Sequence, residues 1–315
     1  MNADPSHYRL LHRTAIVGAL LVIGVVGLSA FMRLSADGLS CQPWPQCYAD
    51  AMQAQQQGVF RPAADNQVVI ARVLHRLFAI LLLPLTLILL FAGFSARPQR
   101  WRGRWLAVAA LVVVLFLAVL GRATAGSRLP AVTLGNLLGG FVLFALFWCM
   151  AALPREPVPA RHSSRWHWLA VFCLMAQIAL GALVSGSHAA LSCPLVGECP
   201  IVTPPPWASL NPWQVPIFDP HTEPWYPGGT LLHWLHRAWS LLAVLAVAMS
   251  ARCRAATGDR HGAALLVTLT LCQVGLGVLA VGLALPLWVV LAHNLTAALL
   301  LAVAASATAS AGQRI

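Results

Sequence analysis

The chain has 315 residues, of which 59% are apolar and only 9% are charged, and its mean hydropathy is +0.75. A soluble globular domain normally carries about 25% charged residues, so this composition excludes an ordinary soluble domain and indicates that lipid covers much of the surface. The net charge of +11 comes from 20 arginines, with no lysine. These arginines fall in short clusters between apolar runs and not along one polar face, which argues against nucleic-acid binding.

Eight apolar runs follow one another along the chain, each close to the roughly 20 residues that a membrane-spanning helix needs. Backbone groups inside a bilayer must be paired within the protein, so we predict a helix for every run. The first run has an alternative interpretation as a cleaved signal peptide, but it is long for one and has a counterpart in the second half. The predicted helices cover residues 14–33, 69–93, 105–124, 131–152, 167–187, 230–250, 262–283 and 287–310.

The arginines also predict how the helices are oriented in the membrane. Thirteen of the 20 lie before the first run, after the last or in the alternate connections that face the same side, and the positive-inside rule makes that side cytoplasmic. Both termini are then cytoplasmic, and two long loops, at 34–68 and 188–229, lie outside. The pattern predicts an all-α multi-pass protein of the bacterial cytoplasmic (inner) membrane.

Three landmarks recur in the same order in the two halves of the chain. Leu-Ser-Cys at 39–41 returns at 191–193, Leu-His-Arg at 74–76 returns at 235–237, and Leu-Pro at 129–130 returns at 285–286. We therefore predict two duplicated four-helix bundles, at 1–153 and 154–315. They have the same orientation because an even number of helices separates equivalent positions, and such a duplication often places one site in each half.

Four of the eight cysteines fall on the predicted outer side, as Cys41 with Cys47 and Cys193 with Cys199. A close pair in an oxidising compartment is typical of a disulfide that closes a small loop. A metal-binding pair and redox-active thiols are the alternatives. We favour the disulfides Cys41–Cys47 and Cys193–Cys199, and we interpret the remaining cysteines as small packing residues.

Three histidines lie at similar depths inside predicted helices that contain no acidic residue: His75, His236 and His293. Polar groups inside a membrane are costly and usually functional. At 1.5 Å per residue, all three lie roughly 10 Å below the outer surface. Two histidines at one depth on facing helices can bind a haem iron from both sides, so we predict His236 and His293 as such a pair. The alternative for each is a hydrogen bond to a neighbouring carbonyl.

The arginines that follow two of these histidines, Arg76 and Arg237, can pair with haem propionates or extend to lipid phosphate. In the first half, Gly135 or Asn136 stands where the second half has His293. A haem at His75 would therefore keep one weak or open side, which oxygen chemistry requires, whereas two histidines suit electron transfer. We expect the first half to hold haem more weakly than the second.

The segment from Arg33 to Cys47, the two His-Arg pairs and the eight-helix duplication resemble the haem A synthase family over nearly the whole chain. The resemblance implies oxidation of the C8 methyl group of haem O to a formyl group, giving haem A for cytochrome c oxidase. It also implies haem B as cofactor, held by His236 and His293. His75 would hold the substrate haem O as the catalytic-site ligand.

The sequence departs from the family pattern at two places. The family has a second histidine in the fourth helix, here Gly135 or Asn136, and often a glutamate one turn before the first His-Arg, here Arg72. The alternative function is therefore a non-catalytic haem-binding or electron-transfer paralogue that assists oxidase assembly. As partners we expect haem O, haem O synthase, the oxidase assembly pathway, membrane lipid and a quinol electron donor, together with assembly into a homo-oligomer.

Overall fold

The computed structural model describes residues 5–36, 66–95, 101–123, 127, 129–153, 165–193, 195, 197–199, 207–215 and 227–310. This part of the chain contains eight helices that are long and apolar enough to cross a membrane, and it contains no β-strand. The predicted all-α membrane architecture is therefore confirmed. The predicted pair Cys41–Cys47 lies outside the described residues.

Each helix corresponds to one predicted apolar run and differs from it only in where it begins or ends. They are α1 (Pro5–Ala36), α3 (Asn66–Ser95), α4 (Trp101–Ala123), α5 (Pro130–Ala151), α6 (Arg165–Gly186), α7 (Thr230–Ala256), α8 (Arg260–Gly282) and α9 (Leu287–Ser310). The largest differences from prediction are the start of α1, expected at residue 14, and the end of α7, expected at residue 250. Polar residues lower the hydropathy at these ends, but they do not interrupt the backbone hydrogen bonds of the helix.

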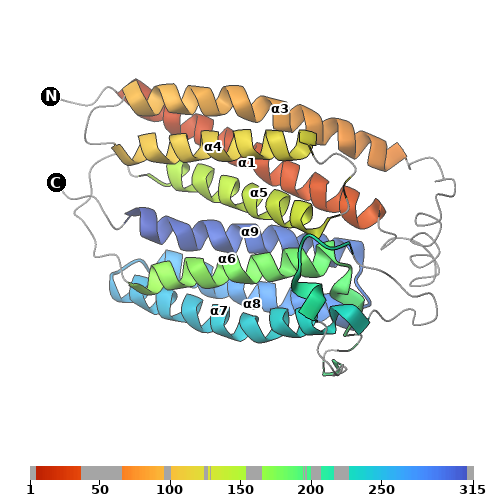
Figure 1. Ribbon diagram of the computed structural model, residues 1–315. Helices are drawn as coiled ribbons and strands as arrows, with labels where there is room; N and C mark the ends of the chain where they lie inside the picture. Colours follow the sequence, from red (N-terminus) through yellow and green to blue (C-terminus); the bar gives the residue numbers. More distant parts are fainter. Residues whose placement is uncertain are drawn as a thin grey trace.

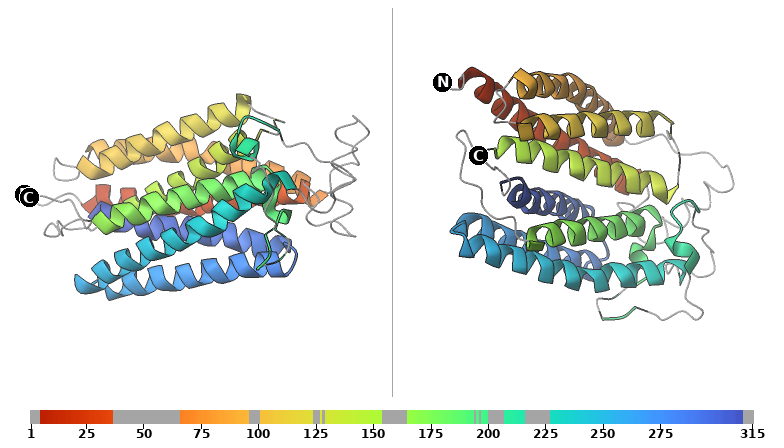
Figure 2. Two further views of the ribbon diagram at one scale, coloured as in Figure 1. Left: turned by 60° about the horizontal axis from the view of Figure 1, so that its bottom comes forward. Right: turned by 60° about the vertical axis from the view of Figure 1, so that its left-hand side comes forward.

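The helices of each half pack in a closed ring. In the first half α1 contacts α3, α3 contacts α4, α4 contacts α5, and α5 returns to α1; α6, α7, α8 and α9 contact one another in the same order. The two rings meet where α5 contacts α6 and α9 and where α1 contacts α9 (Figure 1). Both views in Figure 2 show the long helices running roughly along one common direction. The start of α1 and the end of α9 lie at the same end of the molecule (Figure 1).

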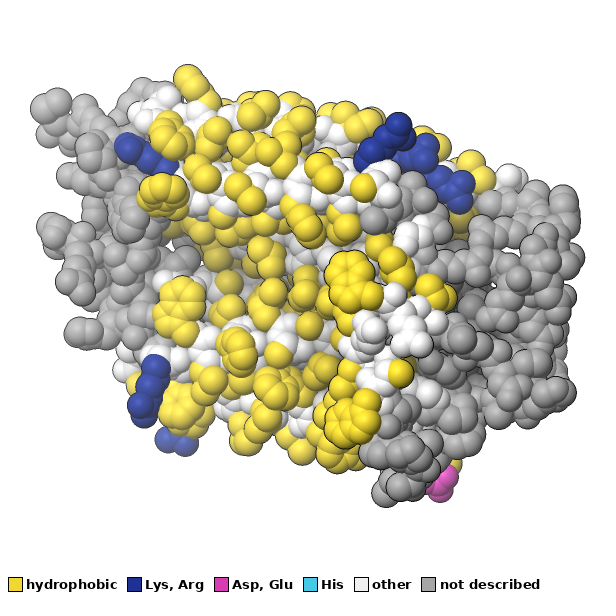
Figure 3. All heavy atoms as spheres, viewed as in Figure 1, with side chains coloured by type: hydrophobic (Ala, Val, Ile, Leu, Met, Phe, Trp, Pro, Cys, Tyr) yellow, Lys and Arg dark blue, Asp and Glu magenta, His cyan; other side chains and the backbone are white. Residues whose placement is uncertain are grey.

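On the face shown in Figure 3, the surface between the two ends is largely apolar, and the visible arginines lie towards the ends. Large side chains such as Ile80, Leu241 and Leu271 are about two-thirds exposed, at 69%, 67% and 68%. In contrast, small residues such as Ala107 and Ala298 are fully buried between helices. Small residues allow membrane helices to approach closely, and lipid solvates the large ones.

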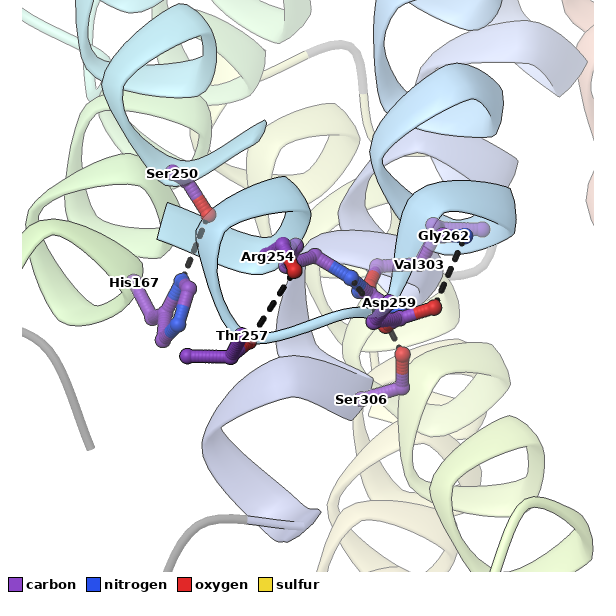
Figure 4. A network of polar contacts seen from close by, with 8 residues as sticks. All are labelled: His167, Ser250, Arg254, Thr257, Asp259, Gly262, Val303 and Ser306. Carbon is purple, nitrogen blue, oxygen red and sulfur yellow. Dashed lines mark hydrogen bonds and ion pairs between the residues drawn. The ribbon is translucent and has the colours of Figure 1, made fainter. Parts of the chain in front are cut away.

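At the end of the molecule where α1 starts and α9 ends, a polar network joins the four helices of the second half (Figure 4). Asp259 caps α8 by accepting a backbone N–H of its first turn at 3.0 Å, and it forms an ion pair with Arg254 of α7. Arg254 also donates to the carbonyl oxygen of Val303 in α9, at 3.0 Å. His167 of α6 lies 2.7 Å from the hydroxyl of Ser250 in α7. The network holds α6, α7, α8 and α9 together at this end of the molecule.

At the opposite end of the molecule, three short 3₁₀ turns follow α6: η2 (Ala189–Leu191), η3 (Trp207–Leu210) and η4 (Pro227–Gly229). The backbone N–H of Ala131 in α5 donates to the carbonyl oxygen of Pro212 at 2.8 Å. This bond attaches the connection between α6 and α7 to the first turn of α5 in the first half.

Candidate functional site

A cavity of about 330 Å³ lies inside the ring formed by α6, α7, α8 and α9. This volume falls in the range of small-molecule and cofactor sites, about 300–1,000 Å³. Most of the lining is apolar, and the first half closes one side with Leu34 of α1 and with Leu137 and Phe141 of α5. The second half therefore encloses an apolar chamber that the first half completes.

His236 of α7 and His293 of α9 both line this cavity. In the ring, α7 and α9 are diagonal partners, each packed mainly on α6 and α8 rather than on one another. At about 1.5 Å per residue, each histidine lies about 9 Å beyond the first residue of its helix, Thr230 or Leu287. The two imidazoles therefore enter one chamber from opposite corners at matched depths.

Two glutamines on the intervening helices contact these imidazoles, and sequence reasoning missed both of them. The amide nitrogen of Gln177 in α6 lies 3.2 Å from Nδ1 of His236 and donates to its carbonyl oxygen at 3.1 Å. The amide nitrogen of Gln273 in α8 lies 3.0 Å from Nε2 of His293. The carboxamide oxygens of both glutamines and Nδ1 of His293 are buried without a hydrogen-bond partner.

Glycines provide the space that these imidazoles occupy. A Cβ atom at Gly181 would lie 3.0 Å from Cε1 of His236, and one at Gly277 would lie 3.2 Å from Cε1 of His293. Each glycine stands four residues after one of the glutamines, so Gln-x-x-x-Gly occurs at 177–181 and again at 273–277. This repeated spacing, which places both residues on one helix face, is the signal that could have identified them.

The outer end of the cavity carries His233 and Arg237 of α7. His233 is buried, and its Nδ1 has no hydrogen-bond partner. The Arg237 guanidinium donates to the carbonyl oxygens of Cys193 and Leu195, each at 3.1 Å. Cys193 and Cys199 form a disulfide with a Cα–Cα distance of 4.4 Å, which confirms that predicted pair. Arg237 is therefore held at the mouth of the cavity by the disulfide-closed loop.

His75 and Arg76 lie on α3 in the first half and do not line this cavity. His75 is half-buried and lies on the helix face that also carries the buried residues Ala71 and Leu82. Arg72 and Arg76 are exposed. The structure thus brings His236, His293 and Arg237 together and leaves His75 in the other half.

The two positions that could replace a second ligand in the first half face different directions. A Cβ atom at Gly135 would lie 2.8 Å from Leu120 of α4, whereas one at Gly140 would meet Val26 of α1 at 3.1 Å. Asn136 lies about 100° around the helix from Gly135, between these two directions. Asn136 therefore faces the interior of the first ring, towards the diagonal helix α3.

The family model described as "Cytochrome oxidase assembly protein" matches residues 12–305. The chain belongs to this family. It is 30% identical to the haem A synthase of Shewanella oneidensis, in an alignment that covers 92% of each chain. It is 29% identical to the haem A synthase of Erythrobacter litoralis, over 92% of this chain and 94% of that protein. With its eight spanning helices and these bacterial relatives, this family member is a multi-pass protein of the inner membrane.

Proposed function

We propose that this protein is a haem A synthase, an oxidoreductase that converts the C8 methyl group of haem O to a formyl group for cytochrome c oxidase. The observation that carries the proposal is the apolar cavity with His236 and His293 at matched depths on diagonal helices. Its weight comes from the membership of the chain in the oxidase assembly family and its likeness to haem A synthases along nearly its whole length.

The residues around this cavity fit haem B. The apolar lining suits a macrocycle, and the two imidazoles approach from opposite corners. His236 and His293 would hold the iron, and Arg237 at the mouth would place a cation beside a propionate. When bound, the haem supplies one-electron redox chemistry. The apolar side chains of Leu137 and Phe141 would cover the haem from the first half.

We assign the substrate site to the first half, residues 1–153, and the cofactor site to the second half, residues 154–315. His75 lies on the face of α3 that carries buried residues, and Asn136 faces the interior of the first ring from the diagonal helix. Since the asparagine amide is a poor iron ligand, His75 would hold haem O from one side only. A single ligand leaves the substrate more weakly bound, so the product can leave after oxidation.

The two halves form duplicated four-helix bundles, with both termini in the cytoplasm. The common order of helix packing in the two rings supports the duplication. The arginines near the start of α1, between the spans and at the chain end support the orientation. A redox cofactor enclosed by membrane helices suits a quinol electron donor that is dissolved in the bilayer. We also propose that haem O arrives through lipid from haem O synthase and that the protein forms a homo-oligomer.

Pigment extraction from a bacterial host that makes haem O but lacks its own haem A synthase tests this function. We expect haem A or its hydroxylated precursor in membranes that contain this protein, and only haem B and haem O in membranes with the empty vector. If the purified protein carries haem B and the host makes no oxidised haem O, the proposed synthase is wrong. That result would support the alternative function, a non-catalytic haem-binding paralogue.

A further inference from the structure

We propose that Gln177 and Gln273 are positioning residues for the two cavity histidines and that their carboxamide oxygens accept the Nδ1–H of the iron-ligating imidazoles. This inference rests on the haem B site proposed above. In the structure each amide nitrogen is close to a ring nitrogen of one histidine, at 3.2 Å for Gln177 and 3.0 Å for Gln273. Each glutamine is therefore already in contact with one of the two imidazoles.

Unsatisfied polar atoms indicate which contact is missing. The carboxamide oxygens of Gln177 and Gln273 are buried acceptors without a partner, and Nδ1 of His293 is a buried ring nitrogen without one. Leaving a buried polar group unpaired is unfavourable, because the group has lost its hydrogen bonds to water. The unpaired atoms on Gln273 and His293 belong to two side chains that are already in contact, so rotation of those side chains can bring them together.

Iron binding makes these atoms complementary. A neutral imidazole that ligates a metal through Nε2 carries its proton on Nδ1, which then becomes a donor. The amide nitrogen of Gln273 lies 3.0 Å from Nε2 in the structure, and it loses this acceptor when Nε2 is occupied. The carboxamide oxygen can then accept the Nδ1–H. Such a bond fixes the ring orientation and increases electron donation to the metal.

Two hydroxyl groups that line the same cavity behave differently. The hydroxyl of Thr270, which also lines the cavity, donates to the carbonyl oxygen of Leu266 in its own helix at 2.7 Å. The hydroxyl of Ser240 donates to the carbonyl oxygen of Arg237 at 2.6 Å. These hydroxyls are satisfied locally and require no ligand. The glutamines instead reach across to neighbouring helices, at the two places where a glycine admits an imidazole.

The test compares Gln273→Leu, Gln273→Glu and the matched control Thr270→Val in the full-length protein loaded with haem B. Leucine has a similar size and removes the unpaired oxygen, so it should fold, and glutamate is a stronger acceptor. We expect Gln273→Leu to keep a low-spin spectrum, to retain haem about 10–100-fold less tightly and to raise the midpoint potential. Gln273→Glu should lower the potential, because a stronger acceptor stabilises ferric iron. Thr270→Val should match the wild type in both measurements.

The outcomes separate this assignment from the proposed haem site. A wild-type protein that is low-spin, with a potential and haem retention unchanged in both Gln273 variants, overturns the glutamine assignment alone. An equal shift in Thr270→Val also overturns it, because any change in the cavity lining would then suffice. A wild-type protein that forms no low-spin complex with haem B overturns the haem site and this assignment with it.

Discussion

Each imidazole in the cavity occupies space left open by a glycine on the neighbouring helix. A Cβ atom at Gly277 would stand 3.2 Å from the ring of His293, closer than the 3.4 Å at which ordinary van der Waals contact begins. Gly275, on the same helix, would place its Cβ with no atom within 4 Å. Both residues are glycines inside α8, but only Gly277 faces an imidazole.

We expect Gly277→Ala to weaken the low-spin haem signal, because the new methyl group displaces the ring of His293 by a few tenths of an ångström. Gly275→Ala should leave the signal unchanged, although both substitutions have the same effect on intrinsic helix propensity. Absorption spectra of the two purified variants at equal protein concentration provide the measurement. Equal spectra would contradict the close approach at Gly277.

We predict that His236→Ala and His293→Ala each abolish the low-spin signal, since iron then loses one of two strong axial ligands. The protein should remain in the membrane, because the helices are held by lipid and by apolar packing rather than by these rings. Immunoblots of membranes and spectra of the purified variants measure the two effects. An unchanged low-spin spectrum in either variant would rule out this ligand pair.

At the scale of elements, the outer loop of the second half is attached to α7 through Arg237. The guanidinium binds two carbonyl oxygens, those of Cys193 and Leu195, in the segment closed by the disulfide. The cation at the mouth of the cavity is thereby fixed in place rather than extended towards lipid phosphate. The orientation of one side chain thus depends on a covalent bond in a separate segment.

Counting free thiols tests the disulfides. The described cysteines that form no disulfide are Cys149, Cys173, Cys253 and Cys272, and the chain has eight cysteines in all. If both predicted outer pairs are bonded, the denatured protein takes up four maleimide labels without a reductant and eight after reduction, as measured by mass spectrometry. Six labels without a reductant would show that one of the two pairs is open.

The inner end of α8 depends on Asp259, which caps the helix and pairs with Arg254. We expect Asp259→Ala to lower the free energy of unfolding by about 1–2 kcal/mol, mainly through loss of the cap. Arg252 is exposed on the same turn of α7, so Arg252→Ala should change stability by about 0.5 kcal/mol or less. Thermal unfolding in detergent compares the two variants. A smaller loss for Asp259→Ala than for Arg252→Ala would contradict the role of the cap.

At the scale of the whole molecule, the two rings have the same packing order and share a wall of one cavity. The second ring holds a large cavity with two histidines, and the first contributes Leu34, Leu137 and Phe141 to the wall of that cavity. Residues of both halves therefore line this one cavity, although both predicted iron ligands, His236 and His293, lie in the second half.

The start of α1 and the end of α9 lie at one end of the molecule, and the arginine distribution predicts that this end is cytoplasmic. A green fluorescent protein fused to the C-terminus should therefore fluoresce, because it folds in the cytoplasm. An alkaline phosphatase fused there should be inactive, because it requires the oxidising outer compartment for its disulfides. The reverse pattern would invert the orientation.

The sequence by itself determined the eight spans, the helical class and the presence of histidines within those spans. A bilayer imposes length, apolarity and internal backbone pairing on each segment separately, so these features depend on local composition. The Cys193–Cys199 bond was also predictable, since its partners are close in the chain. The depth of His236 and His293 followed from the helix rise, because each is counted from the start of its own helix.

Only the tertiary structure decided which residues meet. It placed Gln177 beside His236 and Gln273 beside His293, and it turned Asn136 rather than Gly135 towards the interior of the first ring. It also placed the guanidinium of Arg237, which lies on α7, against a carbonyl oxygen of the disulfide-closed loop. These contacts depend on the order of helices around each ring and on the rotation of each helix about its axis. Both are set by packing between segments that lie far apart in the chain, and hydropathy carries no information about that packing.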